Sequence, residues 1–149
     1  MAAQLTITEI DKLQQVFQDY APAQKALATL AAQDGRLEES FNELCHEEYG
    51  TLPQMPTGKS LWGVTLKNLR QELCGDDSFR TKVQEYSKNP GSTPLLTGLI
   101  VYLVGMAGLP LDPAIATFVV LYLLKVGFNI FCEYTEAAVD QDSRRIPHD

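Results

Sequence analysis

The sequence is poor in the side chains from which most catalytic and metal sites are built. It has two histidines, one tryptophan and three cysteines. The cysteines Cys45, Cys74 and Cys132 are odd in number and widely spaced, which argues against a disulfide framework. They also lack the paired C-x-x-C spacing that is typical of zinc sites. We therefore expect unpaired cysteines and a reducing compartment.

An excess of basic residues is also missing. The chain has 12 Lys and Arg against 19 Asp and Glu, which gives a net charge of −7 over 149 residues. A nucleic-acid-binding protein needs a basic surface to neutralise phosphates, so nucleic acid is not an expected partner. The first twenty residues include Glu9, Asp11 and Asp19 and no apolar core of a signal peptide. We expect no secretory leader.

No segment alternates between polar and apolar residues as a half-buried strand would. Instead, residues 1–91 contain about five segments with apolar residues at helical spacing. Thr8 is the expected N-cap of the first and Asp34-Gly35 the end of the second, and the third covers residues 37–49. Ser60 and Asp76 are the expected caps of the fourth and fifth. The pattern predicts an acidic helical bundle over residues 1–91.

The following residues are far more apolar, since 27 of the 39 residues from Pro94 to Cys132 are hydrophobic. Leu95 to Leu109 and Ala114 to about Glu136 form two helical runs that are separated by a turn at 109–113. Asp112 is a suitable N-cap, and Pro113 suits the first position of a helix. The predicted fold is therefore all-α. A small N-terminal bundle is followed by a hydrophobic helical hairpin at 92–136 and by a polar tail at 137–149.

The hairpin suggests a membrane because no charged residue lies between Lys88 and Asp112, or between Asp112 and Lys125. A membrane-spanning helix needs about 20 apolar residues, with about 17 as the lower limit. The first run reaches that length only if Thr93 and Leu111 are included, whereas the second reaches it easily but contains Lys125. The basic residues that precede the hairpin would place both termini in the cytoplasm. Three glycines could allow the two helices to pack closely: Gly98, Gly105 and Gly108. On this interpretation a lipid bilayer is a partner.

The competing interpretation is a soluble cytoplasmic protein in which the hairpin forms the buried core or a homodimer interface. Its support is a polar stripe that lipid would not tolerate, along one side of the second run. The stripe is the candidate surface for self-association or for a polar pore. Its residues are Tyr122, Lys125, Asn129 and Glu133.

Three short motifs each resemble part of a known binding or catalytic motif, and none is complete. Residues 56–60 (PTGKS) match only the end of a phosphate-binding loop, and no strand precedes them. Glu43 and His46 form half of a di-iron ligand set, but the second half is missing because the only other histidine is His148. Arg145 and His148 lie too close together, beside Pro147, to act as a ribonuclease-like pair on one helix. We expect no catalytic residue, no metal, no cofactor and no enzymatic activity.

An acidic ridge in the third helix is the candidate surface for a partner protein. Glu39, Glu43 and Glu47 recur every four residues, near a helix C-terminus where negative charge is unfavourable. Lys59, Lys67 or Arg70 would neutralise the ridge in an ordinary fold. The primary hypothesis is a non-enzymatic, membrane-associated protein whose bundle binds a partner or signal and whose hairpin anchors in or perturbs the bilayer. The alternative is a soluble adaptor domain.

Overall fold

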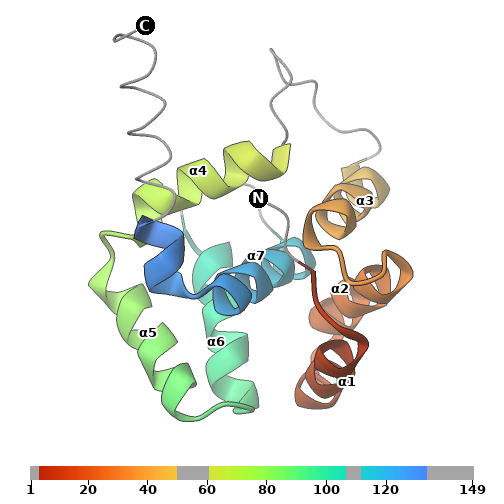
Figure 1. Ribbon diagram of the computed structural model, residues 1–149, viewed down its shortest axis with the longest axis horizontal. Helices are drawn as coiled ribbons and strands as arrows, with labels where there is room; N and C mark the ends of the chain where they lie inside the picture. The colour runs from red at the N-terminus through yellow and green to blue at the C-terminus, as the bar shows by residue number, and fades with distance from the viewer. Residues whose placement is uncertain (1–3, 50–60, 107–111, 134–149) are drawn as a thin grey trace, which may run out of the picture.

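The computed structural model describes residues 4–49, 61–106 and 112–133, and these residues are helical apart from turns, caps and one isolated bridge. The prediction of an all-α protein is confirmed for this part of the chain. A further helical segment covers residues 128–133. The seven principal helices (Figure 1) are α1 Ile7–Val16, α2 Ala21–Ala32, α3 Leu37–Tyr49, α4 Leu61–Leu73, α5 Asp77–Lys88, α6 Thr93–Val104 and α7 Pro113–Val126.

Most helix starts follow from the side chain that precedes them. Asp76, Ser92 and Asp112 each accept a hydrogen bond from a backbone N–H of the first helical turn, so they cap α5, α6 and α7. The expected cap of α1 was wrong. Thr6 rather than Thr8 is the N-cap, because its hydroxyl accepts from the Glu9 N–H while the Glu9 carboxylate accepts from the Thr6 N–H.

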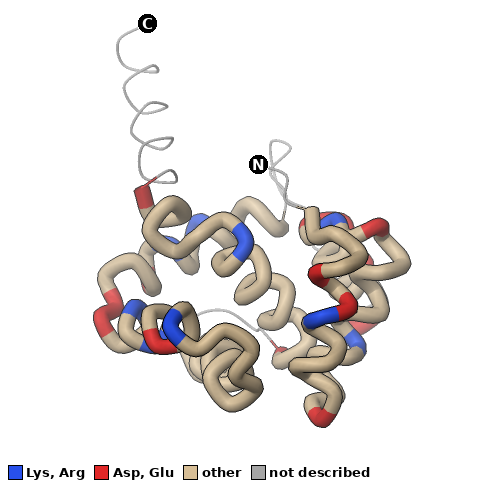
Figure 2. The backbone as a smooth tube through the Cα atoms, turned by 60° about the horizontal axis from the view of Figure 1, so that its bottom comes forward, with Lys and Arg blue, Asp and Glu red and all other residues tan. Residues whose placement is uncertain are grey.

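Helix α7 lies in the centre of the molecule. It packs against α2, α3 and α6, with α1–α3 on one side and α5 and α6 on the other (Figure 1). Every residue from Ala114 to Leu123 is buried. Such burial on all sides requires a helix that is apolar all round. Lys125 is the only charged residue of α7. Figure 2 shows the charged residues as short blue and red segments of the backbone tube, with long uncharged stretches between them. The hydrophobic helix α7 is therefore covered by the chain's own helices.

Both hydrophobic helices are shorter than the sequence pattern predicts. Helix α6 ends at Val104 with Gly105 as its C-cap, and α7 ends at Val126. Gly127 has a φ of 97°, a left-handed value that glycine adopts without strain and that ends the α7 helix. The expected continuous run to about Glu136 was thus wrong. No helix among the described residues is long and apolar enough to cross a bilayer.

One cluster of buried side chains includes residues of the predicted bundle and of both hydrophobic helices. Phe41 of α3, Trp62 of α4 and Tyr122 of α7 form a chain of edge-to-face ring contacts, with centroid distances of 4.9 and 5.3 Å. Such aromatic pairs stabilise a core beyond the area that they bury. The predicted boundary at residue 91 therefore lies within a shared core.

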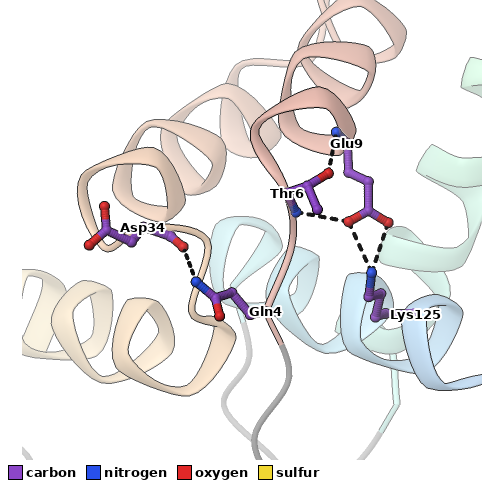
Figure 3. Close-up of polar contacts among 5 residues, drawn as sticks. All are labelled: Gln4, Thr6, Glu9, Asp34 and Lys125. Carbon is purple, nitrogen blue, oxygen red and sulfur yellow. Dashed lines mark hydrogen bonds and ion pairs between the residues drawn. The ribbon is translucent and has the colours of Figure 1, made fainter.

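The residues before α1 are held against the turn between α2 and α3. The Leu5 N–H donates to the Gly35 carbonyl at 2.8 Å, and the Gln4 side chain donates to the Asp34 carbonyl at 2.8 Å (Figure 3). Gly35 has a φ of 80°, and a Cβ there would collide with the Leu5 carbonyl oxygen. Only glycine fits this position. The predicted helix end at Asp34-Gly35 is therefore confirmed, and Gly35 also allows the close approach of the Leu5 backbone.

Candidate functional site

The acidic ridge lies on the outer face of α3. Glu39, Glu43 and Glu47 are all exposed there. The opposite face of α3 packs into the core through Leu37, Phe41, Leu44 and Cys45, all of which are buried. The amphipathic pattern therefore fixes the three carboxylates on one side of the helix, one turn apart. The structure brings together all three residues that the sequence singled out.

Neutralisation of the ridge differs from the expectation. Among the described residues, Glu39, Glu43 and Glu47 form no ion pair, whereas the neighbouring Glu48 pairs with Lys25 of α2 at 3.0 Å. Lys59, one expected neutraliser, lies outside the described residues. Glu39 lies in the first turn of α3, where the helix dipole favours a carboxylate, whereas Glu47 lies in the last turn, where it does not. Like charges one turn apart repel each other by a few tenths of a kcal/mol per pair. A cationic partner would relieve this repulsion.

The polar stripe predicted on the second hydrophobic run is not one continuous helical face, because α7 ends before Gly127. Tyr122 is buried in α7, where its ring packs edge-on against Trp62 and Phe131. Asn129 lies beyond the break and accepts a 2.7 Å hydrogen bond from the guanidinium of Arg80. Glu133 is exposed. The stripe's proposed role in self-association stays a prediction.

Lys125, the one charge in the hydrophobic helix α7, contacts α1. Its ammonium lies 3.0 Å from both carboxylate oxygens of Glu9 (Figure 3). The pKa of Glu9 is lowered, first by the hydrogen bond from the Thr6 backbone and then by Lys125. The Glu9 carboxylate therefore serves two purposes, as part of the α1 cap and as counter-ion for α7. Sequence reasoning missed this pair because 116 residues separate its members.

The glycines of α6 do not provide close packing in the described residues. A Cβ added at Gly98 would meet no atom within 4 Å, and one at Gly105 would meet only carbonyl oxygens of the preceding turn of α6. Gly108 lies outside the described residues. The expectation that Gly98 and Gly105 allow a close helix approach was wrong, because α6 packs through its leucines and Ile100 instead.

A disulfide bond joins Cys74 and Cys132, so the expectation of unpaired cysteines was wrong for these two. Cys74 follows α4 and Cys132 lies in the helical segment after α7, and the fold brings their Cα atoms to 5.7 Å. A separation of 58 residues gives no hint of this proximity. The expectation of a reducing compartment rested on the cysteines and on the lack of an apolar signal core, and it loses the first of these supports.

The remaining cysteine, Cys45, is buried between α3 and α7. Burial raises the pKa of its thiol to about 11, and the negative charge of Asp112 adds to the effect. The thiol is therefore protonated at neutral pH and is a poor nucleophile. Glu43 and His46, the incomplete metal motif, are both exposed on α3. No group of three potential metal ligands gathers within the described residues, and residues 56–60 lie outside them.

A groove that the sequence did not reveal runs between α1, α7 and the junction of α5 with α6. Its volume is about 660 Å³. It exists because α1 packs mainly on α2 and meets α7 through the Glu9–Lys125 pair. Helical periodicity predicts which face of α1 is apolar. It does not predict that a groove separates this face from α7.

The groove is braced by two polar contacts. The Thr93 hydroxyl, at the start of α6, donates to the Val16 carbonyl at 2.6 Å. The Glu9–Lys125 pair joins α1 to α7 on the other side. These contacts hold the walls apart at a fixed spacing, so the groove is formed in the free protein.

The structure therefore has two candidate sites. One is the exposed acidic face of α3, and the other is the apolar groove between α1 and α7. Comparison of the chain with protein-family models, with curated proteins and with solved structures found no match.

Proposed function

We propose that the chain is a non-enzymatic protein-interaction domain that binds a basic segment of a partner through the outer face of α3. The carboxylates of Glu39, Glu43 and Glu47, which form no ion pair within the described part of the chain, make up the contact surface. The single observation that carries the proposal is their shared exposure, without an ion pair to any cation among the described residues. Glu48 on the same helix, by contrast, is paired with Lys25.

The burial of α7 supports this proposal over the membrane anchor. The sequence favoured lipid because the apolar run seemed too large for the domain to cover. In the fold, α2, α3 and α6 cover it. Insertion of α7 into a bilayer would first have to expose the core of the whole molecule, whereas binding through α3 needs no rearrangement.

The geometry of the ridge defines the partner's chemistry. Three carboxylates over eight residues of helix span about 12 Å. A partner helix or extended strand that carries several Lys or Arg residues can match that length. Each exposed ion pair contributes less than about 1 kcal/mol. The ridge should therefore accelerate association and make binding sensitive to salt, with apolar neighbours supplying the rest of the affinity.

The test uses a display library of 15-residue peptides that is selected on the wild-type protein. We expect the selected peptides to be rich in Lys and Arg and to bind more weakly as salt rises. The triple variant Glu39→Lys, Glu43→Lys, Glu47→Lys should lose at least about tenfold in affinity for them. A matched control, Asp19→Lys, Glu72→Lys, Glu85→Lys, reverses three exposed charges elsewhere and should retain binding.

Equal loss of affinity in both triple variants would refute the ridge as a specific surface, because net charge alone would then explain binding. Selection of peptides without basic residues would refute the proposed partner class. Flotation of the wild-type protein with neutral phosphatidylcholine vesicles would instead favour insertion of the hydrophobic helices. Circular dichroism of each variant checks that the helices remain folded.

A further inference from the structure

The groove between α1 and α7 is hydrophobic at its base and positively charged at its edge. Several of its apolar side chains are only half-buried, so they remain partly in contact with water: Leu13, Val16, Tyr86 and Leu124. A ligand that covers them gains the free energy of removing this surface from water. The apolar base therefore selects for a hydrocarbon chain or ring.

The charges at the edge do not cancel. Glu9, Lys12 and Lys125 line the groove, and Glu9 is fully engaged by Lys125 and by the Thr6 N–H. Lys12 is exposed and forms no ion pair with a described residue. The groove thus has a net charge of +1 in a chain whose net charge is −7. This local reversal of sign favours an anionic head group.

The size of the groove decides between a small ligand and a protein segment. A volume of about 660 Å³ falls within the range of small-molecule sites. A protein partner would need to cover about 800 Å² on this side, which is more than one short groove provides. The contacts of Thr93 with Val16 and of Lys125 with Glu9 fix the walls, so little ordering cost is added on binding.

We propose that this groove binds a free fatty carboxylate, with the hydrocarbon chain along α7 and the carboxylate at the Lys12 ammonium. The site is separate from the acidic ridge, since no residue of α3 lines it. Failure of one proposal therefore leaves the other standing.

The probe is laurate, kept below its micelle concentration, and binding is measured by calorimetry and by amide chemical shifts. We expect laurate to bind better than dodecan-1-ol, and the shifts to cluster on α1 and α7. Lys12→Gln should weaken laurate binding at least about threefold and leave dodecan-1-ol unchanged. Lys67→Gln removes the same charge from exposed α4, outside the groove, and should have no effect.

Glu9→Gln is a test in the opposite direction. Glutamine at this position can still complete the capping box. Lys125 then loses its counter-ion, so laurate affinity should rise about threefold or more. No laurate binding, equal binding of laurate and dodecan-1-ol, or equal effects of Lys12→Gln and Lys67→Gln would each overturn the proposal. Binding to anionic phospholipid vesicles without binding of monomeric laurate would also overturn it.

Discussion

Helices α6 and α7 have nearly the same composition but different surroundings. Helix α7 is buried from Ala114 to Leu123, on every side. Helix α6 is buried only along Leu96, Leu99, Ile100 and Leu103, and Val101 on its other side is 57% exposed. Hydrophobicity by itself therefore does not tell which helix forms the centre of the core. The number of helices packed around each one decides which is central, since α7 contacts α2, α3 and α6 while α6 contacts α5 and α7. Four predictions concern these two helices and their surroundings.

The largest expected effect concerns the disulfide that joins the helical segment after α7 to Cys74, the residue after α4. Replacing Cys132 by Ser opens a loop of 58 residues, and the chain-entropy relation assigns such a loop about 4 kcal/mol of stability. Urea unfolding of the variant and of the reduced wild type should agree. The Cys45→Ser variant keeps the disulfide and serves as the control under reduction. Unchanged stability after reduction would contradict the structural role of the bond.

The second prediction makes one substitution in both helices. Val119 of α7 is 0% exposed, so Val119→Ala leaves a cavity and should lower the free energy of unfolding by about 2 kcal/mol. Val101→Ala on the outer side of α6 should change it by less than about 0.5 kcal/mol. Chemical denaturation of the pair measures the difference in burial directly. Equal losses would mean that both helices are covered.

The third prediction concerns free space on α6. A Cβ at Gly98 meets no other atom within 4 Å, so Gly98→Ala should stabilise the protein by about 0.5–1 kcal/mol through its higher helix propensity. On α7, Ala116 is fully buried, and Ala116→Val should destabilise by about 1–3 kcal/mol through overpacking. Thermal unfolding distinguishes the two signs. A loss of stability in Gly98→Ala would mean that Gly98 does allow a close approach of another helix.

The smallest effect is expected at the polar contact on the outer side of α6. The Tyr102 hydroxyl donates to Asp76 at 2.6 Å, which lowers the pKa of Asp76, with help from the Phe79 N–H, and raises the pKa of Tyr102. The pair is accessible to solvent and so contributes little. Its contribution is present between about pH 4 and pH 10, the ordinary pKa values of the two groups. It is lost as pH falls through the lowered pKa of Asp76 or rises through the raised pKa of Tyr102.

Tyr102→Phe removes the hydrogen bond, so the stability difference from wild type should be greatest near pH 7. It should shrink as the pH is lowered below about 4. Urea titrations at several pH values measure it. The same difference at pH 2 and at pH 7 would show that the hydroxyl acts through packing and not through the carboxylate. Asp76→Asn, which keeps a capping side chain, gives a second comparison.

Local signals predicted much of the secondary structure. Asp112 before Pro113, and the amphipathic run of α3, identify their helices because capping and periodicity act over a few residues. The choice between Thr6 and Thr8 as cap failed because both have an acidic residue three positions later. Only the longer side chain of Glu9 completes the reciprocal bond with its cap. The outward position of the acidic ridge also followed from helical spacing.

Contacts between distant segments could not be predicted. The partner of Lys125 is 116 residues away, and that of Cys74 is 58 residues away. The groove depends on how α1 is placed relative to α7, which no local pattern encodes. The end of α7 could not be predicted for another reason. Glycine is tolerated within helices, so Gly127 by itself did not indicate that the helix stops there. Only its φ of 97° shows that the chain turns at Gly127.

The central position of α7 also has a consequence for the biosynthesis of the chain. Of the seven helices, α7, against which α2, α3 and α6 pack, is the last to leave the ribosome. Until then, the faces of α2 and α3 that pack against α7 are uncovered, and these contacts join residues about 60 or more positions apart in the chain. Nascent chains that end before α7 should therefore be natural clients of chaperones.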